Sequence, residues 1–129
     1  MPFSTNLATA ALTVLIILQS VMLISLFAGV PPHPPAATPA FGMGPFIGSS
    51  VAFAASALII GVTSSHTGRA FGVVAAVMAL VSFGPQKYVD PQFHLIWPAV
   101  LTAQLTTVIL IVLVFKSVRT KTEGANDAA

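Results

Sequence analysis

The sequence predicts an all-α integral membrane protein, an antiparallel bundle of four transmembrane helices. Of its 129 residues, 56% are hydrophobic, and the mean hydropathy is +0.95. Only 6% are charged, whereas a soluble domain carries roughly a quarter. Apolar stretches long enough to cross a bilayer alternate with short polar or proline-rich breaks. A chain this short cannot hide so much apolar surface from water, which excludes a soluble globular enzyme.

The first span is predicted over about residues 7–30. This stretch exceeds the roughly 20 residues that cross a hydrocarbon core of about 30 Å. It ends at Pro31 and Pro32, because proline cannot continue a helix. It has no preceding Lys or Arg and is longer than the apolar part of a signal peptide. We therefore expect an uncleaved first helix, followed by an extended proline-rich connection.

The second and third spans are predicted over about residues 45–63 and 68–84. Pro45 suits the first position of a helix, and the polar run 63–68 separates the two apolar segments. A single re-entrant pair would place Arg69 in lipid, at a cost of about 2.5–3.5 kcal/mol on insertion scales. Two separate spans are therefore favoured, although the third is short for a full crossing.

The fourth span is predicted over about residues 94–116, so that residues 1–119 form a single membrane domain. Residues 120–129 are expected to form a mobile polar cytoplasmic tail. An even number of spans places both termini on one side of the membrane. Four of the five basic residues share that side: Arg69, Lys116, Arg119 and Lys121. The positive-inside rule makes that side cytoplasmic, and we expect the bacterial inner (plasma) membrane.

Two glutamines lie near the middle of the first and fourth spans, where an unpaired amide is costly. We predict a direct hydrogen bond between Gln19 and Gln104 that fixes the first helix against the last. Such pairs average about 0.6 kcal/mol, so the bond would set register more than stability. Two alternatives remain, namely that these amides line a path for a transported substrate or contact a neighbouring subunit. Four hydroxyl side chains at comparable depth are able to join the network: Ser20, Ser56, Thr106 and Thr107.

Small residues recur at four-residue spacing in the second and third spans. The two stripes are Gly48, Ala52 and Ser56, and Gly68, Gly72 and Ala76. Small side chains let membrane helices approach closely, so we expect the stripes to face each other in a tight antiparallel hairpin. The alternative is that Gly and Ala are simply common in membrane helices.

Of the three histidines, His94 best fits a haem or pigment ligand, because aromatic residues flank it and such a ligand needs a packed apolar pocket. The preferred interpretation is an interfacial histidine without a ligand. His33 and Asp90 are expected on the same side as His94, but Pro91 disturbs the helical register, and a metal needs converging ligands. We therefore predict no metal site and no cofactor.

The sequence contains no motif for catalysis or nucleic-acid binding. There is no cysteine, no embedded carboxylate for a proton relay, no nucleotide-binding motif and no dense basic stripe. We therefore expect a protein that is not an enzyme and does not bind nucleic acid. The chain is expected to contact the lipid bilayer. Three cations are expected to lie against anionic headgroups, each with an attraction of about 1 kcal/mol: Lys116, Arg119 and Lys121.

The best functional hypothesis from sequence is a small accessory or structural subunit of a larger membrane complex, such as an electron-transfer or transport assembly. Its expected partners are other membrane subunits, and a homo-oligomer is compatible with the pattern. The first alternative is a small homo-oligomeric channel or facilitator lined by mid-membrane Gln and Thr. The second is a haem- or pigment-carrying subunit that uses His94.

Overall fold

The computed structural model describes residues 2–30 and 39–128, and within these ranges the regular structure is entirely helical. The elements are α1 (Pro2–Ala28), α2 (Ala40–Ile60), α3 (His66–Phe83), the short 3-10 helix η1 (Pro85–Val89) and α4 (Phe93–Asp127). Four helical segments in these ranges are long and apolar enough to cross a membrane, η1 extending the third of them. The predicted four-helix membrane bundle is therefore confirmed.

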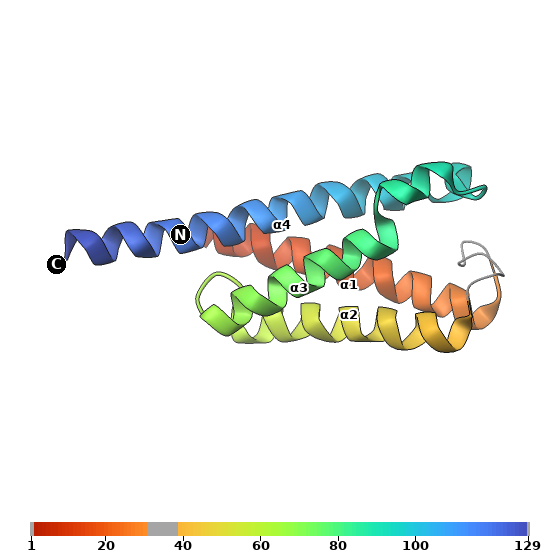
Figure 1. Cartoon of the computed structure of the whole chain (residues 1–129), viewed down its shortest axis with the longest axis horizontal. Helices are drawn as coiled ribbons and strands as arrows, with labels where there is room; N and C mark the ends of the chain where they lie inside the picture. Colours follow the sequence, from red (N-terminus) through yellow and green to blue (C-terminus); the bar gives the residue numbers. More distant parts are fainter. Residues whose placement is uncertain (1, 31–38, 129) are drawn as a thin grey trace.

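Consecutive helices run in opposite directions and pack into a bundle (Figure 1). Each helix packs against its neighbours in sequence, and α4 also packs against α1. The start of α1, the α2–α3 loop and the last turns of α4 meet at one end, which we call the basic end. There the hydroxyls of Thr5 and Thr63 lie 3.2 Å apart, and Lys121 Nζ donates to the Ser64 carbonyl at 2.8 Å. The opposite end, which contains η1, is called the η1 end.

The second helix begins earlier than the sequence indicated, at Ala40 instead of Pro45. Pro39 is its N-cap, and the Pro39 carbonyl accepts from the backbone N–H groups of Gly42 and Met43. Pro45 therefore lies inside the helix, where its missing N–H removes one backbone hydrogen bond. The lost bond is the one that a residue at this position would donate to the Phe41 carbonyl, in the second turn of the helix.

The third helix is short, and a side chain closes its end. Gln86 Nε2 donates to the carbonyls of Val81 at 2.6 Å and Leu80 at 3.4 Å. Carbonyl groups in the last turn of a helix lack N–H partners within the helix, so this side chain supplies a donor. Gly84 makes this turn feasible, since a Cβ there would collide with the Leu80 carbonyl oxygen and with Gln86 Oε1. The chain then continues as η1, which extends the apolar segment to Val89.

The fourth helix is much longer than its predicted span. At 1.5 Å per residue its 35 residues extend about 50 Å, well beyond a hydrocarbon core of about 30 Å. Its last turns project past the bundle (Figure 1). Residues 120–127, expected as a polar tail, continue the helix and are exposed. The mobility of this tail stays a prediction.

The core is built from small and branched apolar side chains. Leu12, Leu15, Ile47, Val100 and Leu110 are its largest fully buried apolar members. Interleaved alanines allow the helices to approach closely. The outward surfaces of all four helices carry exposed Val, Ile, Leu and Phe side chains, as a lipid-facing surface does.

Candidate functional site

The small-residue stripe of α3 lies in the bundle interior. Gly68, Gly72 and Ala76 are all buried. A Cβ at Gly72 would lie 2.6 Å from Val62 Cγ2, and one at Gly68 would collide with the Gly61 carbonyl oxygen. These glycines therefore allow α3 to pack directly on the loop that follows α2.

The matching stripe of α2 does not face α3, so this part of the hairpin prediction is wrong. Ala52 is exposed, Gly48 and Ser56 are only half-buried, and a Cβ at Gly48 would meet no atom within 4 Å. The buried face of α2 consists of other residues: Gly44, Ile47, Ser50, Ala54 and Ala57. Because α2 packs against both α1 and α3, its buried face points between those helices, and the predicted stripe is turned outward.

Gln104 connects α4 to the end of α3 and to η1. Its Nε2 donates to the Phe83 carbonyl at 2.9 Å, and its Oε1 accepts from the Tyr88 hydroxyl at 2.7 Å. The Tyr88 ring also packs edge-on against Phe93, with centroids 5.3 Å apart. Both polar ends of the Gln104 amide are thus satisfied, one by the last residue of α3 and the other by η1.

Gln19 is buried at 1% exposure, and neither amide atom has a hydrogen-bond partner among the described residues. The predicted Gln19–Gln104 hydrogen bond is therefore wrong. The physical reason is that the Phe83 carbonyl, which ends α3 without a helical partner, competes successfully for the Gln104 amide.

Two serines resemble Gln19 because they are also buried without a hydrogen-bond partner among the described residues. Ser50 on α2 and Ser82 on α3 are buried, and their hydroxyl oxygens lack a partner among the described residues. Of the buried threonines, Thr107 instead returns its hydroxyl to the Ala103 carbonyl at 2.7 Å, which satisfies it within its own helix. Since buried polar groups are usually hydrogen-bonded, Gln19 is an energetically costly member of this core.

The two histidines that the structure describes do not lie in a packed pocket. His94 and His66 are exposed, and His33 lies outside the described residues. Within residues 2–30 and 39–128, no group of three His, Cys, Asp or Glu side chains is arranged to hold a metal. Because the His94 side chain is exposed, a packed pocket for haem or pigment would need surfaces from another chain.

Among the residues that the structure describes, Asp90 forms an ion pair with Lys87 and not with a histidine. Lys87 Nζ lies 3.0 Å from Asp90 Oδ2, and the Gln92 backbone N–H donates to Asp90 Oδ1 at 2.9 Å. Partial burial raises the pKa of the Asp90 carboxyl, but the Gln92 hydrogen bond and the Lys87 charge together bring the pKa below its ordinary value. The carboxylate thus stabilises the turn that leads into α4.

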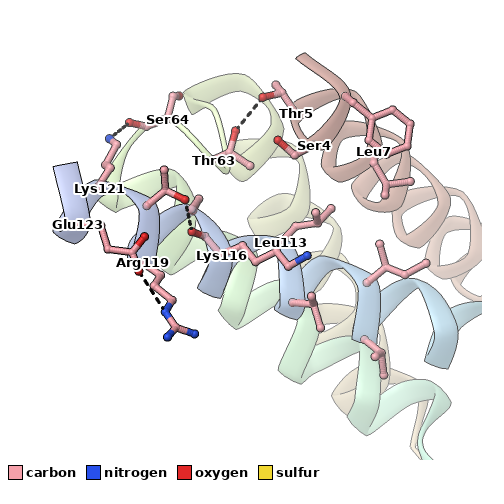
Figure 2. Close-up of a pocket in the computed structure, with 16 residues that line it drawn as sticks. Ser4, Thr5, Leu7, Thr63, Ser64, Leu113, Lys116, Arg119, Lys121 and Glu123 are labelled. Atoms are coloured by element: carbon pink, nitrogen blue, oxygen red, sulfur yellow. Dashed lines mark hydrogen bonds and ion pairs between the residues drawn. The ribbon is translucent and has the colours of Figure 1, made fainter. Parts of the chain in front are cut away.

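An open groove of about 1010 Å³ lies toward the basic end, between the start of α1, the α2–α3 loop and the C-terminal half of α4 (Figure 2). Its apolar lining comes from α1 and α4: Phe3, Leu7, Val108, Ile109, Val112 and Leu113. Its polar lining includes hydroxyl groups and the charged side chains of Lys116, Arg119, Lys121 and Glu123. The sequence predicted cations at a membrane surface, but the groove depends on how α1 and α4 meet, which hydropathy does not show.

The fold and composition define a class, a multi-pass integral membrane protein with four candidate spans. Comparisons with protein-family models, with curated proteins and with solved structures find no match.

Proposed function

We propose that this chain is a small accessory or structural subunit of a larger membrane complex, of the electron-transfer or transport kind. The observation that carries the proposal is the outward-facing stripe of Gly48, Ala52 and Ser56 on α2. Of the four candidate spans, that of α2 has the smallest share of residues buried inside the bundle, 28%. Small residues let a second helix backbone approach closely, and the stripe lies outside the buried face of α2. A transmembrane helix of a partner subunit fits this surface.

Both termini are proposed to lie in the cytoplasm, with the bacterial inner (plasma) membrane as the setting. The support is the charge distribution between the two ends. Lys116, Arg119 and Lys121 lie at the basic end, whereas Lys87 at the η1 end is neutralised by Asp90. The positive-inside rule therefore places the basic end in the cytoplasm. Reporter fusions after Met1 and at Gly124 test this, and opposite sides for the two positions would contradict it.

Affinity purification of the full chain from its native membranes in mild detergent tests the accessory-subunit proposal. We expect defined membrane subunits to co-purify, and an Ala52→Leu substitution to release them. Ala52 is exposed, so the larger side chain blocks close helix approach without disturbing the bundle. Ala10→Leu, at an exposed site on α1, is the matched control and should keep the partners. Recovery of this polypeptide alone from native membranes would contradict the proposal.

The channel alternative requires Gln19, Gln104 and the mid-membrane threonines to line a path in a homo-oligomer. Gln19 instead faces the interior of the bundle, and both polar ends of the Gln104 side chain are engaged. Neither amide is therefore free to line a pore between subunits. We accordingly favour the accessory subunit over the channel.

A further inference from the structure

The groove at the basic end has an uncompensated positive charge. Arg119 Nε lies 3.5 Å from Glu123 Oε1, so these two opposite charges compensate each other. The ammonium of Lys121 is bound to the uncharged Ser64 carbonyl, and Lys116 forms no ion pair within the described residues. Lys116 and Lys121 therefore leave a net positive charge at the rim.

Lys116 is the cation that reaches into the groove. Figure 2 shows its side chain extending from α4 into the space beside the first turns of α1, whereas Arg119 points away from α1. Arg69, the other basic residue at this end, is buried and donates from Nη1 to the Thr63 carbonyl at 3.4 Å. It does not line the groove. The charge inside the groove thus comes from Lys116.

Beneath this cation the lining is apolar and open to the side. Val112 and Val108 lie one and two helical turns from Lys116 toward the middle of α4, and both are about half exposed. At 1.5 Å per residue, the apolar strip that they form reaches about 12 Å along α4 from Lys116. Phe3 and Leu7 of α1 form the facing wall. A ligand that fits this groove is charged at one end and apolar along the rest.

We propose that the groove is a binding site for an anionic phospholipid. Its phosphate lies at the Lys116 ammonium, with Lys121 adding positive charge at the rim. One acyl chain follows the strip formed by Val112 and Val108, between α4 and the start of α1. Basic pockets between transmembrane helices at the cytoplasmic surface bind anionic headgroups in this way. The proposal requires only that the chain spans a membrane, so it is independent of the partner proposed above.

The experiment measures lipid binding to the purified full chain by native mass spectrometry in mild detergent. Phosphatidylglycerol and phosphatidylcholine with identical acyl chains test the role of charge, and glycerol phosphate tests whether the acyl chains are needed. We expect phosphatidylglycerol to bind most tightly and glycerol phosphate to show no binding. Lys116→Gln should weaken phosphatidylglycerol binding about fivefold, which corresponds to about 1 kcal/mol for one lysine near an anionic lipid.

Two further variants test the position of the charge and the role of the apolar strip. Lys87→Gln removes the same charge at the η1 end and should leave the affinity unchanged. Val112→Trp fills the apolar strip at an exposed position and should weaken the binding of both lipids, with helical content retained in circular dichroism. Equal affinity for the two lipids, equal losses in Lys116→Gln and Lys87→Gln, unchanged binding in Val112→Trp, or tight binding of glycerol phosphate would each overturn the proposal.

Discussion

The Tyr88 hydroxyl donates a 2.7 Å hydrogen bond to Gln104 Oε1, and this bond joins η1 to α4 about three turns after the helix begins. The same amide donates to the Phe83 carbonyl at the end of α3. One side chain therefore fixes the α3–η1 connection against the last helix. The carbonyl it satisfies would otherwise lack a partner where α3 ends.

Replacing Gln104 by Leu should destabilise the bundle by about 1–3 kcal/mol, because the Phe83 carbonyl and the Tyr88 hydroxyl both lose their partner. The free energy of unfolding in detergent, monitored by circular dichroism, measures the loss. Tyr88→Phe removes only one of the two bonds and should cost less. An unchanged stability in Gln104→Leu would show that these bonds contribute nothing.

Gln19 should respond in the opposite direction. Its amide is buried without a hydrogen-bond partner among the described residues, so Gln19→Leu removes a desolvated polar group and keeps a side chain of similar size. We expect stability to stay the same or to rise by about 1 kcal/mol. The same unfolding measurement in detergent tests this, and a loss similar to that of Gln104→Leu would show that Gln19 has a partner in the membrane.

The two small-residue stripes allow a matched pair of substitutions. A Cβ at Gly72 would lie 2.6 Å from Val62 Cγ2, whereas one at Gly48 would contact nothing within 4 Å. Gly72→Ala should therefore destabilise the bundle by about 1–3 kcal/mol, and Gly48→Ala should not.

A second substitution identifies the cause of the Gly72 effect. Val62→Ala removes the branched side chain that the new methyl group would meet. The double variant should therefore lose less stability than the two single losses added together. Additive losses in unfolding measurements would show that the clash with Val62 is not the cause.

The sequence predicts the number and order of the membrane helices because these depend on the length of each apolar segment and on the breaks between them. It does not predict which face each helix buries. The stripe of Gly48 on α2 and that of Gly72 on α3 look alike in sequence, yet only the second is buried. Helix rotation depends on which side chains interdigitate across the bundle, and the pattern of one helix does not contain that information.

The partners of the two glutamines could not be predicted for a related reason. Both lie near the middle of a predicted span, and depth in the membrane alone predicts that they meet. Gln104 instead bonds to Tyr88 of η1, a short element that no hydropathy pattern indicates. The groove at the basic end likewise forms only because α1 and α4 are neighbours there. Contacts of this kind depend on tertiary packing.

The Lys87–Asp90 pair should make the η1 end sensitive to acid. The pKa of Asp90 is lower in the folded protein than its ordinary value, because the Gln92 hydrogen bond and the Lys87 charge outweigh the effect of burial. A group with a lowered folded pKa contributes stability above its unfolded pKa, and this contribution is lost as the pH falls through the folded value. Unfolding stability should therefore decrease below about pH 4, by at most about 1 kcal/mol for such a pair. Asp90→Asn should be less stable at neutral pH and should lack this part of the acid dependence. Identical pH profiles of unfolding stability for the original protein and for Asp90→Asn would show that Asp90 does not cause this acid dependence.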